Sequence, residues 1–303
     1  MDVLVGTLAS PALLNSPFDQ RARTVSHIVE AGIDHVFIAD HVSFHVGTGM
    51  DGLINAATLT ALHPDLKVCV GVYLLALRHP IVTARQLSTL AESSAGQLML
   101  GIGVGGEDRN EIAMCGIDPA TRGRRTDECL YIVRELLTGE PLDFEGEFFQ
   151  FERAWIKPAP KLPIPILVGG RADASLRRAA RHGDGWLGIW STPERYRRSV
   201  DEVNRMAQAH GRTTEAHSIQ VWVGVDNDRA HARARLAKGM REFYQIPYER
   251  FEKFSPWGSV DEVADALLAY RDAGCRVFNI MPVAENETIG IEAVARIAQV
   301  LRG

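Results

Sequence analysis

The sequence predicts an α/β fold in which eight parallel strands close into a barrel. Short apolar, β-branched runs alternate with amphipathic stretches, which indicates parallel strands joined by crossover helices. The intervals between the first four runs are 32, 32 and 31 residues, as expected for one repeating strand and helix unit. Four further runs bring the total to eight, the number that closes a (β/α)8 or TIM barrel. We expect a single domain spanning residues 1–303.

Each predicted element has its own local signal. The first helix opens at Ser16-Pro17 and stops at Gly32, with apolar residues at helical spacing between them. The last helix carries an apolar stripe up to Leu301 that would pack on the outside of the barrel. In chain order the predicted strands are 3–9, 35–40, 67–76, 98–105, 164–170, 184–190, 218–226 and 276–283.

Two intervals between strands are too long for one helix. The starts of strands 4 and 5 are 66 residues apart, and those of strands 7 and 8 are 58 apart. We therefore expect insertions after strand 4 and between strands 7 and 8. Residues 143–160 predict a hairpin that turns at Glu145-Gly146, and residues 243–258 predict an aromatic, partly ordered loop. Long insertions on barrels usually shape the mouth of an active site.

Composition excludes several classes of protein. With 33 Lys and Arg against 38 Asp and Glu, the net charge of −5 argues against a general affinity for nucleic acid or anionic membranes. The four cysteines are scattered singly, which fits reduced thiols in a cytoplasmic protein better than disulfides or a zinc site. The chain shows no signal peptide or membrane span.

Asp40 and His41 follow the second predicted strand. In a barrel of this kind the reacting groups lie at the carboxyl ends of the strands, and histidine exchanges protons near neutral pH. The pair is therefore a candidate general acid or base; the alternative is a hydrogen-bonded histidine beside a helix cap. His45 follows four residues later, but no third ligand with metal-site spacing accompanies it, so we expect no metal.

A glycine run, GIGVGG, ends the fourth strand at residues 101–106. It formally satisfies a dinucleotide-binding pattern, but its glycines alternate inside the strand and no acidic strand end follows about 20 residues later. Two interpretations stay open. The glycines either let a flat ring approach the backbone or only ease packing inside a tight barrel.

The fifth strand ends in Gly169-Gly170, followed by Arg171 and a helix. A phosphate would suit this turn, because glycine backbone, helix N–H groups and an arginine can all approach an anion there. The alternative is an ordinary turn before a solvated arginine face. A second basic group, Arg122, Arg124 and Arg125, is either a ligand site or a solvated face.

Six motifs in this order resemble the bacterial luciferase-like flavin- and deazaflavin-dependent oxidoreductases: IADH, VGVYLLALRHPIVTARQLSTL, LGIGVGGEDRNE, RGRRTDE, FEGEFFQF and PIPILVGG. The resemblance implies a flavin or deazaflavin across the barrel mouth, with its phosphate on the turns after strands 4 and 5. Asp40 would then bond the ring system, and His41 would be the acid-base residue. The residues implied to bind the cofactor are Asp40, Tyr73, Leu74, Ala76, Val104, Gly105, Gly106, Asn110, Gly169, Gly170, Arg171 and Ala172.

Two further expectations come from the resemblance. Family members often carry a non-prolyl cis peptide in a bulge of strand 3, which maps here to Tyr73-Leu74. In related sugar-phosphate dehydrogenases a catalytic glutamate directly follows the glycine run, whereas here Gly106 fills that place and Glu107 comes one residue later. Glu107 is thus the second catalytic candidate. The basic residues that hold a sugar phosphate have no clear counterparts, which disfavours that substrate.

The leading hypothesis is an oxidoreductase that passes a hydride between coenzyme F-420 and a small organic substrate. The main alternative is an FMN-dependent monooxygenase that uses molecular oxygen in the same pocket. A non-catalytic flavin-binding barrel is disfavoured by the Asp40-His41 pair. A phosphate-binding isomerase or lyase is disfavoured because strands 7 and 8 lack a glycine cradle. The resemblance also implies a homodimer.

Overall fold

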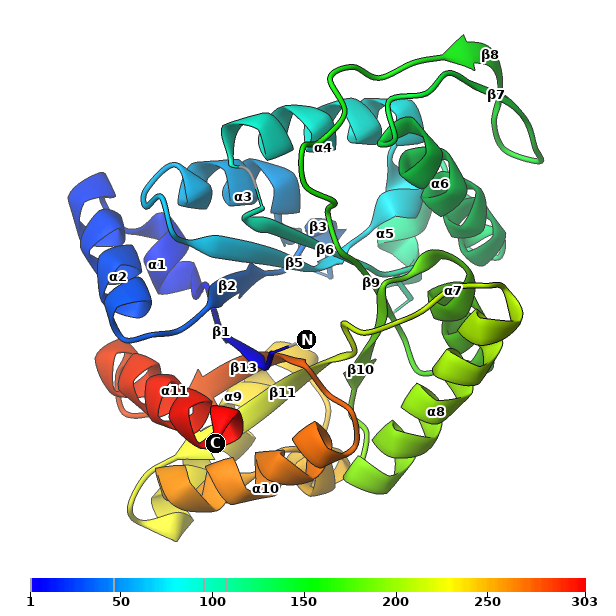
Figure 1. The fold of residues 1–303 in the computed structure, drawn as a ribbon. Coiled ribbons are helices and arrows are strands. Elements are labelled where there is room, and N and C mark those ends of the chain that lie inside the picture. Colours follow the sequence, from blue (N-terminus) through cyan, green and yellow to red (C-terminus); the bar gives the residue numbers. More distant parts are fainter. Residues whose placement is uncertain (1, 46, 95, 107) are drawn as a thin grey trace.

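Eight parallel strands close into a barrel with helices around it (Figure 1), which confirms the predicted fold class. This computed structural model describes residues 2–45, 47–94, 96–106 and 108–303. The strand order around the barrel is β1-β2-β5-β6-β9-β10-β11-β13, and β13 pairs with β1 to close it. In chain order the barrel strands are β1 Leu4–Leu8, β2 His35–Ile38, β5 Lys67–Tyr73, β6 Leu98–Ile102, β9 Ile166–Gly169, β10 Gly185–Ile189, β11 Ser218–Val225 and β13 Val277–Val283.

A ring of helices covers the outside of the strands, one after each of them. Their inward stripes are buried, including the predicted stripe of the last helix from Ile291 to Leu301. Within the residues that the structure describes, every helix is too short or too polar to cross a lipid bilayer. The ring helices are α2 Phe18–Glu30, α3 Gly52–Thr60, α4 Pro80–Ser93, α6 Arg122–Leu136, α7 Asp173–His182, α8 Pro193–Ala209, α10 Val260–Asp272 and α11 Glu287–Arg302.

The remaining elements are additions to this barrel. The hairpin after β6 has its turn closed by Gly146, whose N–H donates to the Phe149 carbonyl at 2.9 Å, as the sequence predicts. The second insertion is more regular than expected, because a long helix and two short 3-10 helices fill most of it. The additions are α1 Pro11–Asn15, β3 His41–Phe44, β4 Thr48–Met50, η1 Leu75–Leu77, α5 Arg109–Met114, β7 Leu142–Glu145, β8 Gln150–Ala154, α9 Arg229–Tyr244, η2 Tyr248–Arg250, η3 Glu252–Phe254 and β12 Trp257–Gly258.

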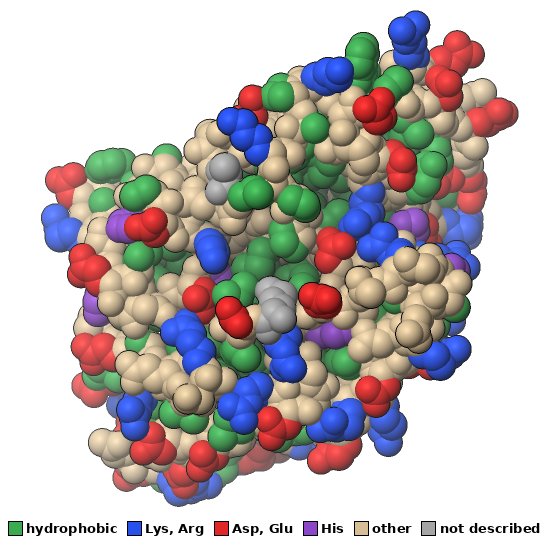
Figure 2. Space-filling view, viewed as in Figure 1, with side chains coloured by type: hydrophobic (Ala, Val, Ile, Leu, Met, Phe, Trp, Pro, Cys, Tyr) green, Lys and Arg blue, Asp and Glu red, His purple; other side chains and the backbone are tan. Residues whose placement is uncertain are grey.

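The two ends of the barrel differ in what they carry. Figure 1 looks onto the end at which the strands begin, with both chain termini toward the viewer. On this face acidic and basic side chains are intermixed around an apolar centre (Figure 2). The strands run away from the viewer, so β3, β4 and α5 lie at the far end. That far end, where the strands finish, is the mouth of the barrel.

A polar pair lies inside the barrel. The ring of His35 is fully buried, and its Nε2 lies 2.7 Å from Oδ1 of Asn279. Gly6 makes room for this ring, since a Cβ there would lie 2.2 Å from it. Burial lowers the pKa of His35 to about 4, although the hydrogen bond to Asn279 acts in the opposite direction. The ring is therefore neutral at pH 7.

The bulge expected in the third barrel strand is present, but the cis bond is not at Tyr73-Leu74. The cis peptide is Gly71-Val72, and this part of the prediction is wrong by two residues. The register between β5 and β6 is broken after Val70 and is restored at Tyr73, so the irregular backbone lies before Tyr73. The sequence motif locates the bulge, but not which of its peptide bonds is cis.

Candidate active site

The side chain of Asp40 is at the centre of a buried ionic network after β2. Its Oδ1 accepts from the N–H of Gly52 at 3.0 Å, and its Oδ2 accepts from that of Leu74 at 2.9 Å. Arg78 adds a bidentate pair, with Nη1 to Oδ2 at 2.5 Å and Nη2 to Oδ1 at 2.8 Å. Burial acts to lower the pKa of Arg78, but the charge and hydrogen bonds of Asp40, together with Tyr73 and Asp51, raise it above its usual value. Among the described residues this carboxylate accepts four hydrogen bonds from the protein itself, and its predicted bond to a cofactor ring stays a prediction.

His41 pairs with a carboxylate that the sequence analysis did not single out. Its Nδ1 lies 3.0 Å from Oε2 of Glu111, which belongs to the first turn of α5. Oε1 of the same glutamate accepts from the N–H groups of Val42 at 2.6 Å and Ser43 at 3.1 Å. The Glu111 side chain is only 3% exposed, while that of His41 is 22% exposed. A buried anion therefore fixes a histidine that remains open to solvent.

The contact with Glu111 decides how the His41 ring can act. A carboxylate only accepts hydrogen bonds, so Nδ1 is the protonated ring nitrogen in this geometry. Nε2 then carries the free lone pair of the neutral ring, and it can take up a proton. An anion behind Nδ1 stabilises the imidazolium that results. An arrangement of this kind can serve as an oriented general base.

The turn that follows β3 is hydrogen-bonded to the loop before α5. The backbone N–H of His45 donates to Oδ2 of Asp108 at 2.8 Å, and this bond is the main cause of the lowered pKa of Asp108. The ring of Phe44 lies between the rings of His41 and His45, with centroid distances of 4.2 Å and 3.9 Å. Glu107, the second predicted catalytic residue, lies outside the described residues.

The glycines that end β6 do not all serve the same purpose. A Cβ on Gly103 would lie 2.4 Å from the Val72 side chain, and one on Gly169 would lie 3.1 Å from it. A Cβ on Gly101 would meet the Val70 carbonyl oxygen at 2.5 Å. These three glycines accommodate the bulge of β5. For Gly101 and Gly103 these contacts favour the packing interpretation, while Gly169 stays a predicted cofactor-binding residue.

The last two glycines of the run lie in a different environment. Gly105 and Gly106 have φ angles of +69° and +148°, which favour glycine. Around the position of a Gly106 Cβ, the nearest described atoms belong to the Arg122 guanidinium, at 3.5 Å. Val104 is half-buried, and Asn110 is exposed in the first turn of α5. This turn offers bare backbone beside a cation, which fits an anionic group of a cofactor.

The turn after β9 is the second place where backbone is exposed. Gly170 has φ +128°, and a Cβ there would lie 2.8 Å from Cβ of Ser175. Ala172 caps the start of α7. Exposed Arg171 stacks over the ring of Trp190, with its guanidinium carbon 4.8 Å from the centroid. The predicted phosphate residues are thus at one turn, at the start of a helix.

The predicted basic group supports neighbouring loops. Nε of Arg125 donates to the carbonyl of Ala76 at 2.8 Å, and Nε of Arg122 donates to that of Gly105 at 3.3 Å. Arg124 instead pairs with Glu147 on the hairpin. Tyr73, Leu74 and Ala76 are buried at the end of β5. Two of the three arginines therefore hold loops that carry predicted cofactor-binding residues.

The opposite side of the mouth carries a group of aromatic rings, which we call the aromatic wall. Its centroid distances are 5.0 Å between Trp190 and Tyr244 and 5.6 Å between Trp222 and Phe243. Nε1 of Trp222 also donates to the Tyr244 hydroxyl at 3.0 Å. The sequence indicated an aromatic insertion but not these contacts. The wall consists of Trp190, Trp222, Phe243, Tyr244 and Phe251.

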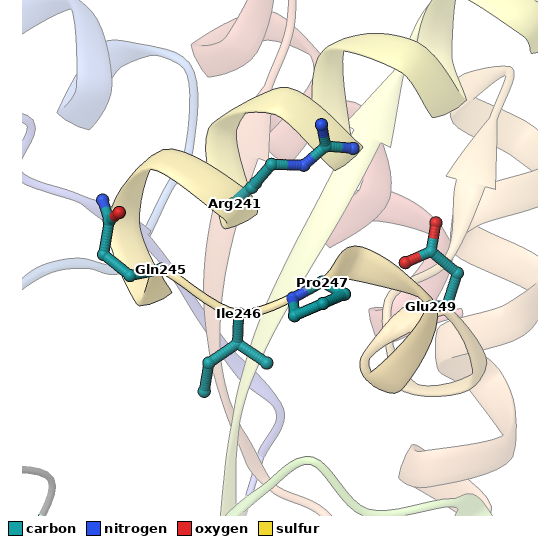
Figure 3. A pocket seen from close by; sticks show the side chains of 5 residues that line it. All are labelled: Arg241, Gln245, Ile246, Pro247 and Glu249. Carbon is teal, nitrogen blue, oxygen red and sulfur yellow. The ribbon is translucent and has the colours of Figure 1, made fainter.

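Two pockets lie away from the strand ends that carry the predicted residues. One, of about 380 Å³, lies between the end of α9 and η2 (Figure 3) and is bordered by Arg241 and Glu249. Its lining residue Ile246 also packs against the apolar cluster that contains Phe251 of the wall. The other, of about 590 Å³, includes Ile166 and Asp184 at the starts of β9 and β10, and so lies at the opposite end of the barrel. In the described part of the chain, no three His, Cys, Asp or Glu side chains gather as they would around a metal ion.

A family model described as luciferase-like monooxygenase matches residues 3–276. The chain belongs to this family. Rv0940c, an uncharacterized protein of Mycobacterium tuberculosis (strain ATCC 25618 / H37Rv), is 37% identical over 174 residues, which are 57% of this chain and 60% of that protein. The chain thus matches less than two thirds of this relative's length. The resemblance predicted from the motifs is confirmed.

Two further comparisons concern proteins whose names mention F420. The F420-dependent glucose-6-phosphate dehydrogenase of Beutenbergia cavernae is 30% identical over 277 residues, covering 85% of this chain and 79% of that protein. A solved structure of an F420-dependent secondary alcohol dehydrogenase in complex with an F420-acetone adduct has a TM-score of 0.86 at 17% identity, covering 100% of both chains. This second likeness shows the shared fold.

Proposed function

We propose that this luciferase-like protein transfers a hydride between coenzyme F-420 and a small organic substrate, with His41 moving the accompanying proton. The observation that carries the proposal is the His41–Glu111 pair, because it orients a solvent-accessible base at the barrel mouth. When bound, a deazaflavin supplies a ring carbon that accepts or donates a hydride. The 30% identity to a protein named as F420-dependent supports this cofactor over FMN.

The residues of this chain then have separate tasks. His41 takes a proton at Nε2 during oxidation of the substrate and returns it in the reverse direction. Glu111 is a positioning residue that fixes the ring through Nδ1. Asp40 is a second positioning residue, since it holds the backbone of Leu74 and the side chain of Arg78 beside the bulge. We retain Glu107 as a further acid-base candidate.

The two glycine turns would bind the phosphate end of the cofactor. Gly105, Gly106 and Gly170 have backbone conformations that disfavour side chains, and Arg122 and Arg171 bring positive charge to these turns. Free N–H groups at the start of α7 favour an anion there. The residues present therefore fit a phosphate-bearing ring cofactor.

An FMN-dependent monooxygenase is the second candidate function, favoured by the description of the family as monooxygenases. A measurement of cofactor affinity distinguishes the two candidate functions. The purified protein is titrated with F-420 and with FMN at matched ionic strength, and quenching of cofactor fluorescence is followed. We expect tighter binding of F-420. Equal or tighter binding of FMN, with oxygen consumption, would replace our proposal by the monooxygenase. The proposal also includes a cytoplasmic location and a homodimer. Light scattering of the purified protein tests the dimer.

A further inference from the structure

The aromatic wall has a defined place at the mouth. Trp222 packs against the apolar cluster inside the barrel, to which Met281 and Leu187 belong, and it also packs against the cluster beneath α9. Val72, in the bulge of β5, packs against the same interior cluster. Trp190 directly follows Ile189, the last residue of β10. The wall therefore begins on the interior surface and continues outward over the end of β11.

The wall also keeps an apolar side chain in contact with solvent. Phe243 is 50% exposed although it lies against Trp222 and Tyr244, whose ring centroids are 5.6 Å and 4.8 Å away. Trp222 and Tyr244 are themselves half-buried, so the three rings form one continuous, partly exposed aromatic surface. Continuous apolar surface of this kind marks a binding site more often than a single exposed residue does. Rings of this kind pack best against other rings and against hydrocarbon.

The charges near the wall are largely neutralised. In α9, Arg233 pairs with Glu252 at 2.6 Å. Two further arginines and a lysine of the same helix also contact carboxylates. The fifth basic residue of this helix, Arg241, borders the small pocket together with Glu249. Arg171, which stacks over Trp190 of the wall, is in no ion pair among the described residues, but the proposed function already assigns its charge to the cofactor phosphate. A phosphate on the substrate would therefore lose its hydration against these rings without gaining a further cation there. The other pairs of α9 are Arg229 with Glu262, Arg235 with Asp226 and Lys238 with Glu242.

We propose that the aromatic wall binds the body of the substrate, and that this body is an uncharged hydrocarbon ring carrying a secondary alcohol or, in reverse, a ketone. The inference rests on the proposed function for its chemistry. In the oxidation, the C–H bond of the alcohol carbon breaks and its hydride passes to oxidised F-420. The hydroxyl proton goes to Nε2 of His41, and the carbon-oxygen double bond forms.

Two substrates of different size test the wall. With F-420 saturating, we compare cyclohexanol with 2-propanol, whose reacting carbon is similar but whose body is too small to cover the rings. Phe243→Ala should raise KM for cyclohexanol about five- to tenfold and leave KM for 2-propanol within twofold, because only the ring body loses apolar contact. Phe18→Ala, another exposed phenylalanine on a helix, is the matched control and should change neither value. Glucose 6-phosphate should be the poorest substrate of the three.

A second readout does not depend on turnover. In saturation-transfer NMR with cofactor-free protein, cyclohexanol should receive magnetisation from the wild type and from Phe18→Ala, but much less from Phe243→Ala. Trp222→Phe, which keeps an aromatic ring, should retain most of the signal. An unchanged signal in Phe243→Ala, or faster oxidation of glucose 6-phosphate than of cyclohexanol, would overturn the assignment of the wall. Absence of F-420 binding with a wall-dependent NMR signal would instead refute the proposed function alone.

Discussion

Around the mouth, the side formed by β2, β5 and α5 is held by ionised groups, whereas the side formed by β10, β11 and α9 is held by aromatic rings in edge-on and tilted contact. On the first side, the carboxylates of Asp40 and Glu111 each accept several hydrogen bonds and are nearly inaccessible to solvent. On the second, rings from three elements meet at centroid distances of 5–6 Å. Hydrogen bonds fix direction, while ring contacts tolerate small displacements.

This difference suggests a division of labour. A proton-transfer group must be held in one orientation, and a buried anion that also binds backbone N–H groups can hold it there. A surface that accepts a hydrocarbon needs area more than direction. Changes on the ionic side should therefore alter rate or stability strongly, and changes on the aromatic side should alter substrate preference.

The largest effect is expected for His41→Ala. If this residue moves the proton, turnover should fall by about 10²–10⁴-fold while the affinity for the cofactor is unchanged. The measurements are kcat at saturating cofactor and fluorescence titration of the same variant. Glu111→Gln retains a hydrogen-bond acceptor for Nδ1 without the charge, and it should lose less rate than His41→Ala. Turnover within about threefold of the wild type in His41→Ala would make the ring structural and leave proton transfer to Glu107 or water.

Asp40→Ala should have the largest effect on stability. It leaves the half-buried guanidinium of Arg78 without its bidentate partner and the N–H of Leu74 without an acceptor. Removing one partner of a buried ion pair typically costs about 3–5 kcal/mol of the free energy of unfolding. Urea denaturation measures this loss. Glu202→Gln, which breaks a solvent-exposed pair with Arg205, is the control and should cost less than about 1 kcal/mol. Equal losses in the two variants would contradict a structural role for Asp40.

His35, which is buried inside the barrel, should stay uncharged at neutral pH, and the stability of the protein should therefore depend on pH. With a folded-state pKa of about 4 against 6.5 when unfolded, His35 takes up more protons in the unfolded chain between these pH values. The free energy of unfolding should therefore fall as the pH drops from about 6.5 to 4, by up to about 3 kcal/mol from this residue. Denaturation across this range should show a shallower slope in His35→Gln and an unchanged slope in exposed His210→Gln. Parallel slopes in all three proteins would argue against a neutral buried ring.

A smaller effect is expected at the turn after β9. Gly170→Asp places a negative charge where we propose that the cofactor phosphate lies, and it should weaken cofactor binding tenfold or more. Because φ is +128° and Ser175 is close, any side chain strains this turn. Gly170→Ala therefore measures the strain alone. If both variants lose the same affinity, charge at this turn is irrelevant and the phosphate lies elsewhere.

The sequence predicts most of the fold and about one side of the mouth. All eight strands are found, since strands of a parallel barrel are buried on both faces and appear as continuous apolar runs. His41 is predictable because it directly follows such a run. Its partner is not, because an acidic residue in the first turn of a helix is common for reasons of the helix dipole alone. Arg78 and Glu111 gain their roles only when the chain closes and brings distant residues together.

The sequence predicts an aromatic insertion, but not which rings meet on this side of the mouth, for a similar reason. The rings of Trp190 and Tyr244 belong to segments more than 50 residues apart, and neither has a motif. An apolar ring looks the same in a sequence whether it fills a core or lines a mouth. An acid-base residue at the end of a barrel strand therefore leaves a local pattern in the chain, whereas its buried ionic partners and the apolar surface do not.

The smallest expected effect concerns Arg171, which touches both sides of this comparison. It follows the glycine turn proposed for the phosphate, and its guanidinium stacks over Trp190 of the aromatic wall. Since the side chain is exposed, we expect Arg171→Ala to cost only about 1 kcal/mol of cofactor binding, which is about fivefold in Kd. If the contribution is electrostatic, the difference between variant and wild type should shrink as salt is raised from 0.05 M to 0.5 M, because screening shortens the range of the charge. A salt-independent loss, accompanied by a higher KM for cyclohexanol, would instead assign Arg171 to the aromatic wall, where it would act by stacking on Trp190.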